Sequence, residues 1–95
     1  MQVFVDVRNA TELYVRGREP GERMQPLGMD GASTKLKEIM IDRKLARPYR
    51  ANWPLITTKD HPIWLVGQMI DERVKITAES TRIIRLTCYQ SSAQK

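Results

Sequence analysis

The chain has 95 residues, which is enough to bury one hydrophobic core and too few for two domains. Apolar residues make up 41% of the chain and charged residues 28%, proportions that are typical of a folded protein and exclude a disordered one. The formal net charge of +5 favours anionic partners, and the single cysteine excludes an internal disulfide and fits a reducing compartment.

Neither secretion nor membrane insertion is indicated. Residues 1–10 lack the basic region and long apolar run of a signal peptide. The longest uninterrupted apolar run, residues 63–66, is far shorter than the roughly 20 residues of a membrane span. We therefore expect a cytoplasmic protein with no membrane partner, in which residues 1–90 form the domain and the polar residues 91–95 fray.

Alternating apolar residues open the chain. Val3, Val5 and Val7 alternate with residues 2, 4 and 6, two of which are polar, and after a polar stretch the alternation resumes at Leu13 and Val15. A period of two is the signature of a half-buried strand. The pattern predicts a β-hairpin, which is followed by an irregular loop because residues 20–31 contain three glycines and two prolines.

One helix is predicted after this loop. Leu36, Ile39 and Met40 fall on one helical face, and either Ser33 or Thr34 is placed to cap the first turn. Pro48 is expected to end the helical region. We further expect Trp64 to be buried beneath the helix face of Leu36, Ile39 and Met40.

The second half of the chain is predicted to be β-structure. Pro54 begins a strand at residues 55–58, which residues 59–62 turn into a second strand at residues 63–66. Two more strands are expected at residues 73–77, with Val74 and Ile76 inward, and at residues 82–89, with Ile84, Leu86 and Cys88 on one face. About six strands and one main helix predict an α+β, mainly β fold, a small β-sandwich or barrel.

The sequence contains no recognisable catalytic or metal motif. There is no Walker A loop, no G-x-G-x-x-G after a strand and no S-G-G-x-D-S loop, and one histidine with one cysteine provides no metal-ligand spacing. We expect His61 to be an exposed turn residue and Cys88 a small buried one. Asp71 and Glu72 are interpreted as residues that form structural ion pairs or hold Arg73, and not as a general acid and base.

Positive charge is concentrated in one stretch. Residues 35–50 contain six cations and two acids, so this stretch supplies +4 of the net +5. Only 6% of residues are aromatic, which favours phosphate contacts on an RNA duplex over stacking with single strands. The alternative is that these cations only solvate a helix face.

Chain continuity is expected to gather the cations on one RNA-binding surface, because the strand end at Arg16 leads into the glycine-rich loop and the loop leads to the helix. Lys59, in a later turn, is expected to matter little. The candidate RNA-binding residues are Arg16, Arg18, Arg23, Lys35, Lys37, Arg43, Lys44, Arg47 and Arg73.

Several motifs in order along the chain resemble the C-terminal domain of bacterial tRNA(Ile)-lysidine synthase. They are VRGREPGER at residues 15–23, PLG at 26–28, KLK at 35–37, IWLVG at 63–67 and IDERVKIT at 70–77. The chain differs from the family at Glu22, where Asp is usual, and at Thr34, where a lysine is common, so one cation is missing at the helix start.

The resemblance implies a fold similar to a module of the phenylalanyl-tRNA synthetase beta subunit and a function in holding the acceptor stem of an isoleucine tRNA. It implies that the parent enzyme uses ATP and Mg²⁺ in a separate N-terminal catalytic domain to attach lysine to the wobble cytidine. The chain itself would then be no enzyme and would need no cofactor. Its expected partners are the isoleucine tRNA and that catalytic domain. The alternative left open is a structural or dimerisation module without direct RNA contact.

Overall fold

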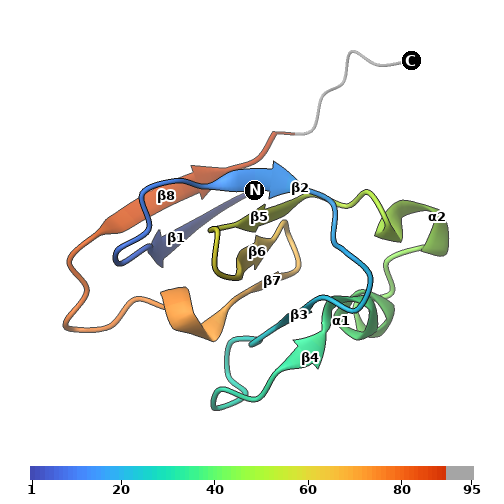
Figure 1. The fold of residues 1–95 in the computed structure, drawn as a ribbon, viewed down its shortest axis with the longest axis horizontal. Coiled ribbons are helices and arrows are strands. Elements are labelled where there is room, and N and C mark those ends of the chain that lie inside the picture. The colour runs from blue at the N-terminus through green and yellow to red at the C-terminus, as the bar shows by residue number, and fades with distance from the viewer. Residues whose placement is uncertain (90–95) are drawn as a thin grey trace.

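The structure, a computed structural model, describes residues 1–89 and is mainly β, as predicted (Figure 1). The tail predicted at residues 91–95 lies outside the described residues. No helix within residues 1–89 is long and apolar enough to cross a membrane. In chain order the elements are β1 (Gln2–Asp6), β2 (Tyr14–Arg16), β3 (Arg23–Met24), β4 (Thr34–Lys35), α1 (Leu36–Asp42), α2 (Arg47–Arg50), β5 (Leu55–Thr57), β6 (Pro62–Leu65), β7 (Met69–Ile70), the 3₁₀ helix η1 (Glu72–Val74) and β8 (Ile83–Thr87).

The strands form three antiparallel groups. A four-stranded sheet has the order β2-β5-β6-β7, and two separate pairs are β1-β8 and β3-β4. The predicted hairpin of the first two strands is therefore wrong, because β1 pairs with β8 and β2 pairs with β5. Alternation predicts that a segment is a strand, but only the tertiary structure decides its neighbour.

The hairpin predicted between residues 55 and 66 is confirmed as β5 and β6. The final strand is confirmed as well, since Ile84, Leu86 and Cys88 are half-buried while the residues between them are exposed. The strand predicted at residues 73–77 is wrong. Its first residues form η1, whose start is capped by the Asp71 carboxylate, and Ile76 is 45% exposed.

The start of α1 differs from the prediction. Neither Ser33 nor Thr34 caps it, because Thr34–Lys35 is strand β4 and the N-cap residue is Lys35, with no side-chain bond. The Leu36 N–H instead donates to the Glu22 carbonyl, at 2.9 Å. The loop predicted to be irregular thus contains β3, the partner of β4.

Pro48 does not end the helical region either. Helix α1 ends at Asp42, just before Lys44 adopts the left-handed conformation with φ of 62°. Pro48 lies in the first turn of α2, where a missing N–H costs no helical hydrogen bond.

Two hydrophobic clusters cover the two faces of the four-stranded sheet. Trp64 is buried as predicted, with 2% exposure, but it packs with Val5 and Val7 of the β1 side and not beneath α1. The helix residues Leu36, Ile39 and Met40 pack instead with Leu55 and Leu65. Because neighbouring strand residues point to opposite faces, α1 covers the face of Leu65 and the β1-β8 pair covers that of Trp64 (Figure 1).

Candidate nucleic-acid interface

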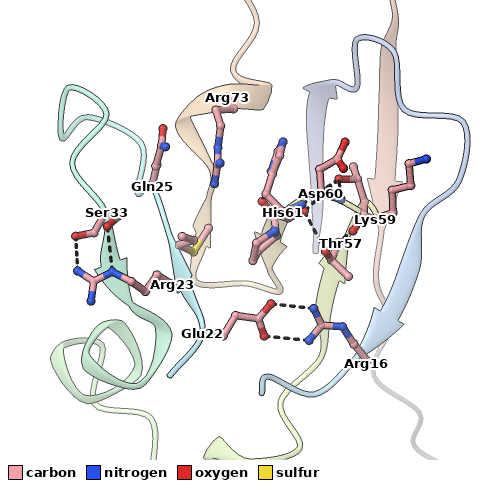
Figure 2. A pocket seen from close by; sticks show the side chains of 13 residues that line it. Arg16, Glu22, Arg23, Gln25, Ser33, Thr57, Lys59, Asp60, His61 and Arg73 are labelled. Atoms are coloured by element: carbon pink, nitrogen blue, oxygen red, sulfur yellow. Dashed lines mark hydrogen bonds and ion pairs between the residues drawn. The ribbon is translucent and has the colours of Figure 1, made fainter. Parts of the chain in front are cut away.

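Three of the predicted RNA-binding residues line one polar cavity. The cavity has a volume of about 330 Å³ and lies between β3, the turn that joins β5 to β6 (residues 58–61) and the start of η1 (Figure 2). Arg16, Arg23 and Arg73 line it, together with Lys59 and His61. We call it the smaller cavity, to distinguish it from a neighbouring one of about 820 Å³ that shares the β5–β6 turn.

Arg73 is fixed by a buried carboxylate. Its Nε and Nη2 donate to the two oxygens of Asp71 at 2.8 and 2.9 Å, and Asp71 is fully buried. The same carboxylate accepts the backbone N–H groups of Gln25 and Arg73, so it joins β3 to η1. Burial alone would raise the pKa of Asp71, but the bonds from Arg73 and from these backbone groups outweigh it, and the pKa lies below its ordinary value. The prediction that Asp71 holds Arg73 is thereby confirmed.

Arg16 is also held by a carboxylate. Its Nη1 and Nη2 donate to the two oxygens of Glu22 at 2.8 and 2.7 Å (Figure 2). The bond from Arg16 lowers the pKa of Glu22, and the backbone N–H of Glu19 adds to the effect. This bidentate pair connects the end of β2 to the start of β3. Because both terminal nitrogens of Arg16 already donate to Glu22, Arg16 mainly shapes the cavity and is not the main donor to an anion.

Arg23 and Lys35 form a pair of like charges on one ladder. They lie directly opposite each other in the β3-β4 pair, and both are exposed. Ser33 orients Arg23, whose Nε donates to the hydroxyl at 2.9 Å and whose Nη2 donates to the carbonyl oxygen at 3.0 Å. Within residues 1–89, Arg23, Lys35 and the nearby Lys37 form no ion pair. Like charges placed opposite each other are destabilising, and an anion between them would relieve the repulsion.

The remaining four predicted residues lie elsewhere. Arg18 is half-buried in the connection after β2, and its Nε has no hydrogen-bond partner among the described residues. Arg43 lines a separate groove of about 440 Å³ with apolar neighbours such as Leu27 and Trp64. Lys44 and Arg47 are exposed beyond the end of α1, and α2 lies at one end of the molecule (Figure 1). None of these four lines the smaller cavity.

Sequence reasoning missed two residues of the cavity, Lys59 and His61. The sequence predicts that Lys59 matters little for RNA binding, yet Lys59 lines the cavity with Arg16, Arg23 and Arg73, so it cannot serve as a distant control. His61 is half-buried and not an exposed turn residue, and its Nδ1 lies 2.7 Å from the Pro62 carbonyl oxygen. A carbonyl only accepts, so Nδ1 carries the proton and Nε2 is left free. Pairing of β2 with β5, which the sequence did not predict, brings this turn beside the arginines.

The chemistry of the cavity is that of anion binding. Its four cations, Arg16, Arg23, Lys59 and Arg73, face Glu22 and Asp60 and the buried Asp71 behind Arg73, which leaves one net positive charge. Among residues 1–89, no group of three His, Cys, Asp or Glu side chains is placed to hold a metal ion. Cys88, expected to be a small buried residue, is half-buried and packs against the hydrophobic cluster that contains Trp64.

Comparisons with known proteins agree on a single family. Residues 13–88 match the family described as the TilS substrate C-terminal domain. A tRNA(Ile)-lysidine synthase of Dehalococcoides mccartyi is 42% identical over 84 residues, which are 87% of this chain and 18% of that protein. The synthase of Geobacter sulfurreducens is 44% identical over 66 residues, 70% of this chain and 14% of that protein. The chain thus spans less than a fifth of the length of these relatives.

Two solved structures share the fold. A crystal structure of a TilS C-terminal domain superposes with a TM-score of 0.74 and 29% identity, covering 88% of this chain and 65% of that one. An N-terminal fragment of the phenylalanyl-tRNA synthetase beta subunit from Pyrococcus horikoshii has a TM-score of 0.66 at 17% identity, over 88% of this chain and 26% of that one. The second likeness concerns the fold alone.

Proposed function

Since this chain belongs to the family of TilS substrate C-terminal domains, we propose that it is the tRNA-binding accessory domain of a tRNA(Ile)-lysidine synthase and that it contacts the acceptor stem of an isoleucine tRNA. The observation that carries the proposal is the exposed pair of Arg23 and Lys35, with Lys37 close by in the chain. These three cations have no carboxylate partner within residues 1–89. Phosphates of an RNA backbone would supply the missing negative charge.

The synthase reaction belongs to another part of the protein in this proposal. ATP and Mg²⁺ are used by the N-terminal catalytic domain of a cytoplasmic enzyme, which attaches lysine to the wobble cytidine. The side chains of the smaller cavity are suited to hold an anion and include no activated nucleophile. The present domain therefore contributes affinity and orientation of the tRNA, and no chemical step.

Titration of a labelled acceptor-stem RNA duplex tests the proposal. Each phosphate neutralised on a duplex contributes about −0.9 to the slope of log K against log salt, so three contacts predict a slope of about −3. Lys37→Glu should weaken binding and flatten this slope.

Arg85→Glu is the matched control. Arg85 is an exposed cation on β8, opposite Phe4. Strand β8 lies away from α1 (Figure 1). The control should change binding less than Lys37→Glu does. Equal losses of affinity in the two variants would mean diffuse charge attraction and not a site. Binding without salt dependence would refute the proposal that the domain binds RNA phosphates.

A second candidate function is packing against the catalytic domain of the same synthase. The observation that favours it is the groove of about 440 Å³ that Arg43 shares with Met1, Leu27 and Trp64, because Met1 and Leu27 leave apolar surface exposed there. Leu27→Glu distinguishes the two functions. It should leave binding of the isolated duplex unchanged if the groove serves protein packing, and it should then lower the stability or activity of the whole synthase.

A further inference from the structure

A second cavity of about 820 Å³, which we call the larger cavity, shares the β5–β6 turn with the smaller cavity. Residues 58–61 and Arg73 line both and form their common wall. We propose that the two cavities together bind one unpaired RNA nucleotide at the end of a stem, with its phosphate in the smaller cavity and its ribose and base in the larger one. This inference rests on the proposed function and adds a single-stranded element to the duplex contact.

The charge of the smaller cavity matches one phosphodiester. Its single net positive charge balances a monoanion, whereas a run of several phosphates would require more. Arg23 and Arg73 are each held by two bonds, from Nε and Nη2, to Ser33 and Asp71 respectively. Nη1 of both arginines has no partner among the described residues. Two guanidinium groups that are already oriented lose little further entropy on binding a phosphate.

The larger cavity has the mixed surface that a nucleoside requires. The side chains of Val7, Ala10 and Val74 give it an apolar part, and Asn9 and Glu12 lie among its polar lining residues. The Asn9 amide both donates and accepts hydrogen bonds, as does the edge of a base. Neither cavity is lined by Phe, Tyr or Trp, and the single imidazole ring of His61 does not make a stacking track for successive bases. One nucleotide is the size of ligand that remains.

Both walls of the larger cavity are braced. On one side the Arg8 Nε donates to the Arg73 carbonyl, and the Arg82 Nη1 donates to the carbonyls of Arg8 and Ala10. On the other side the turn is held by its threonines, because the buried Thr58 hydroxyl accepts the backbone N–H groups of Asp60 and His61. A site formed by such preorganised elements binds its ligand without first ordering a loop.

The test compares two RNA hairpins by fluorescence anisotropy at one salt concentration, a blunt stem and the same stem with one unpaired 3′ nucleotide. We expect the extension to tighten binding about tenfold, the factor that corresponds to one charge-assisted hydrogen bond. Lys59→Gln and Asn9→Ala should each remove most of this gain, and Asn9→Ala should leave blunt-stem binding nearly unchanged. Arg85→Gln, which lies outside both cavities, should retain the whole gain, and circular dichroism checks that each variant is folded.

The outcomes separate this inference from the proposed function. Equal affinity for the two hairpins overturns the inference while the duplex contact stands. A gain that persists in both Lys59→Gln and Asn9→Ala places the extra nucleotide elsewhere and overturns it too. If neither hairpin binds, the proposed function is overturned, and the inference is overturned with it.

Discussion

Asp71→Asn tests the central role of the buried carboxylate. One oxygen of Asp71 accepts from the N and Nε of Arg73, and the other accepts from Gln25 N and Arg73 Nη2. Whichever way an asparagine amide is turned, its NH₂ group faces two donors. A buried donor left without an acceptor costs about 1–3 kcal/mol. Loss of the ion pair to Arg73, whose side chain is 37% exposed, adds at most about 1 kcal/mol.

Together these terms predict that the free energy of unfolding falls by about 1–4 kcal/mol. In urea, followed by tryptophan fluorescence, the midpoint should fall by about 0.5–2 M. Asp60→Asn is the matched control, because Asp60 is exposed in the β5–β6 turn and should change stability by less than about 0.5 kcal/mol. A change of that small size in Asp71→Asn would refute the view that this carboxylate joins β3 to η1.

Three further predictions concern stability and activity. The folded-state pKa values of Asp71 and Glu22 lie below their ordinary values of 3.8 and 4.5. The stabilisation from these two carboxylates is therefore complete above about pH 5 and is lost as the pH falls through the lowered values. Urea midpoints measured from pH 6 to pH 2 should decline below about pH 4.5, and the decline should be less steep in Asp71→Asn. Trp64→Ala should cost about 3–5 kcal/mol, with Trp53 left as the fluorescent reporter, and a loss under about 0.5 kcal/mol would contradict its burial. The isolated 95 residues should show no ATP–pyrophosphate exchange with tRNA and lysine, since their sequence contains no Walker A loop, and measurable exchange would refute the assignment of catalysis to another domain.

The sequence indicated the lysines proposed for duplex contact better than it indicated the residues proposed for the nucleotide site. Lys35 and Lys37 belong to a visibly basic stretch, and the position of Lys35 opposite Arg23 follows from a short-range ladder. Lys59 and His61 stand in an ordinary hairpin turn, and nothing in the local pattern separates them from other exposed turn residues. The wall they form exists only because distant segments meet around them.

Local physical chemistry determined much of the fold. The alternation of Ile84, Leu86 and Cys88 and the helical spacing of Leu36, Ile39 and Met40 report which face of each element avoids water, and these assignments are confirmed. The β5–β6 hairpin is confirmed for the same reason, since strand propensity and a short turn are properties of neighbouring residues. The order of motifs was sufficient to identify the family, which the comparisons confirm.

Tertiary structure alone decided which elements meet. Any sheet that covers the apolar face of β1 keeps it from water, so the pattern of β1 does not reveal its partner. The order along the chain predicted β2, whereas β8, about 80 positions further on, takes that place. Likewise a buried tryptophan does not reveal which layer lies over it, and the one-residue shift from Trp64 to Leu65 exchanges the β1-β8 pair for α1. The cavity depends on the same long-range choices, because the pairing of β2 with β5 brings Arg16 beside the turn and the buried Asp71 holds Arg73 against β3. Such contacts depend on the summed burial of several elements at once, a quantity that no local window of sequence contains.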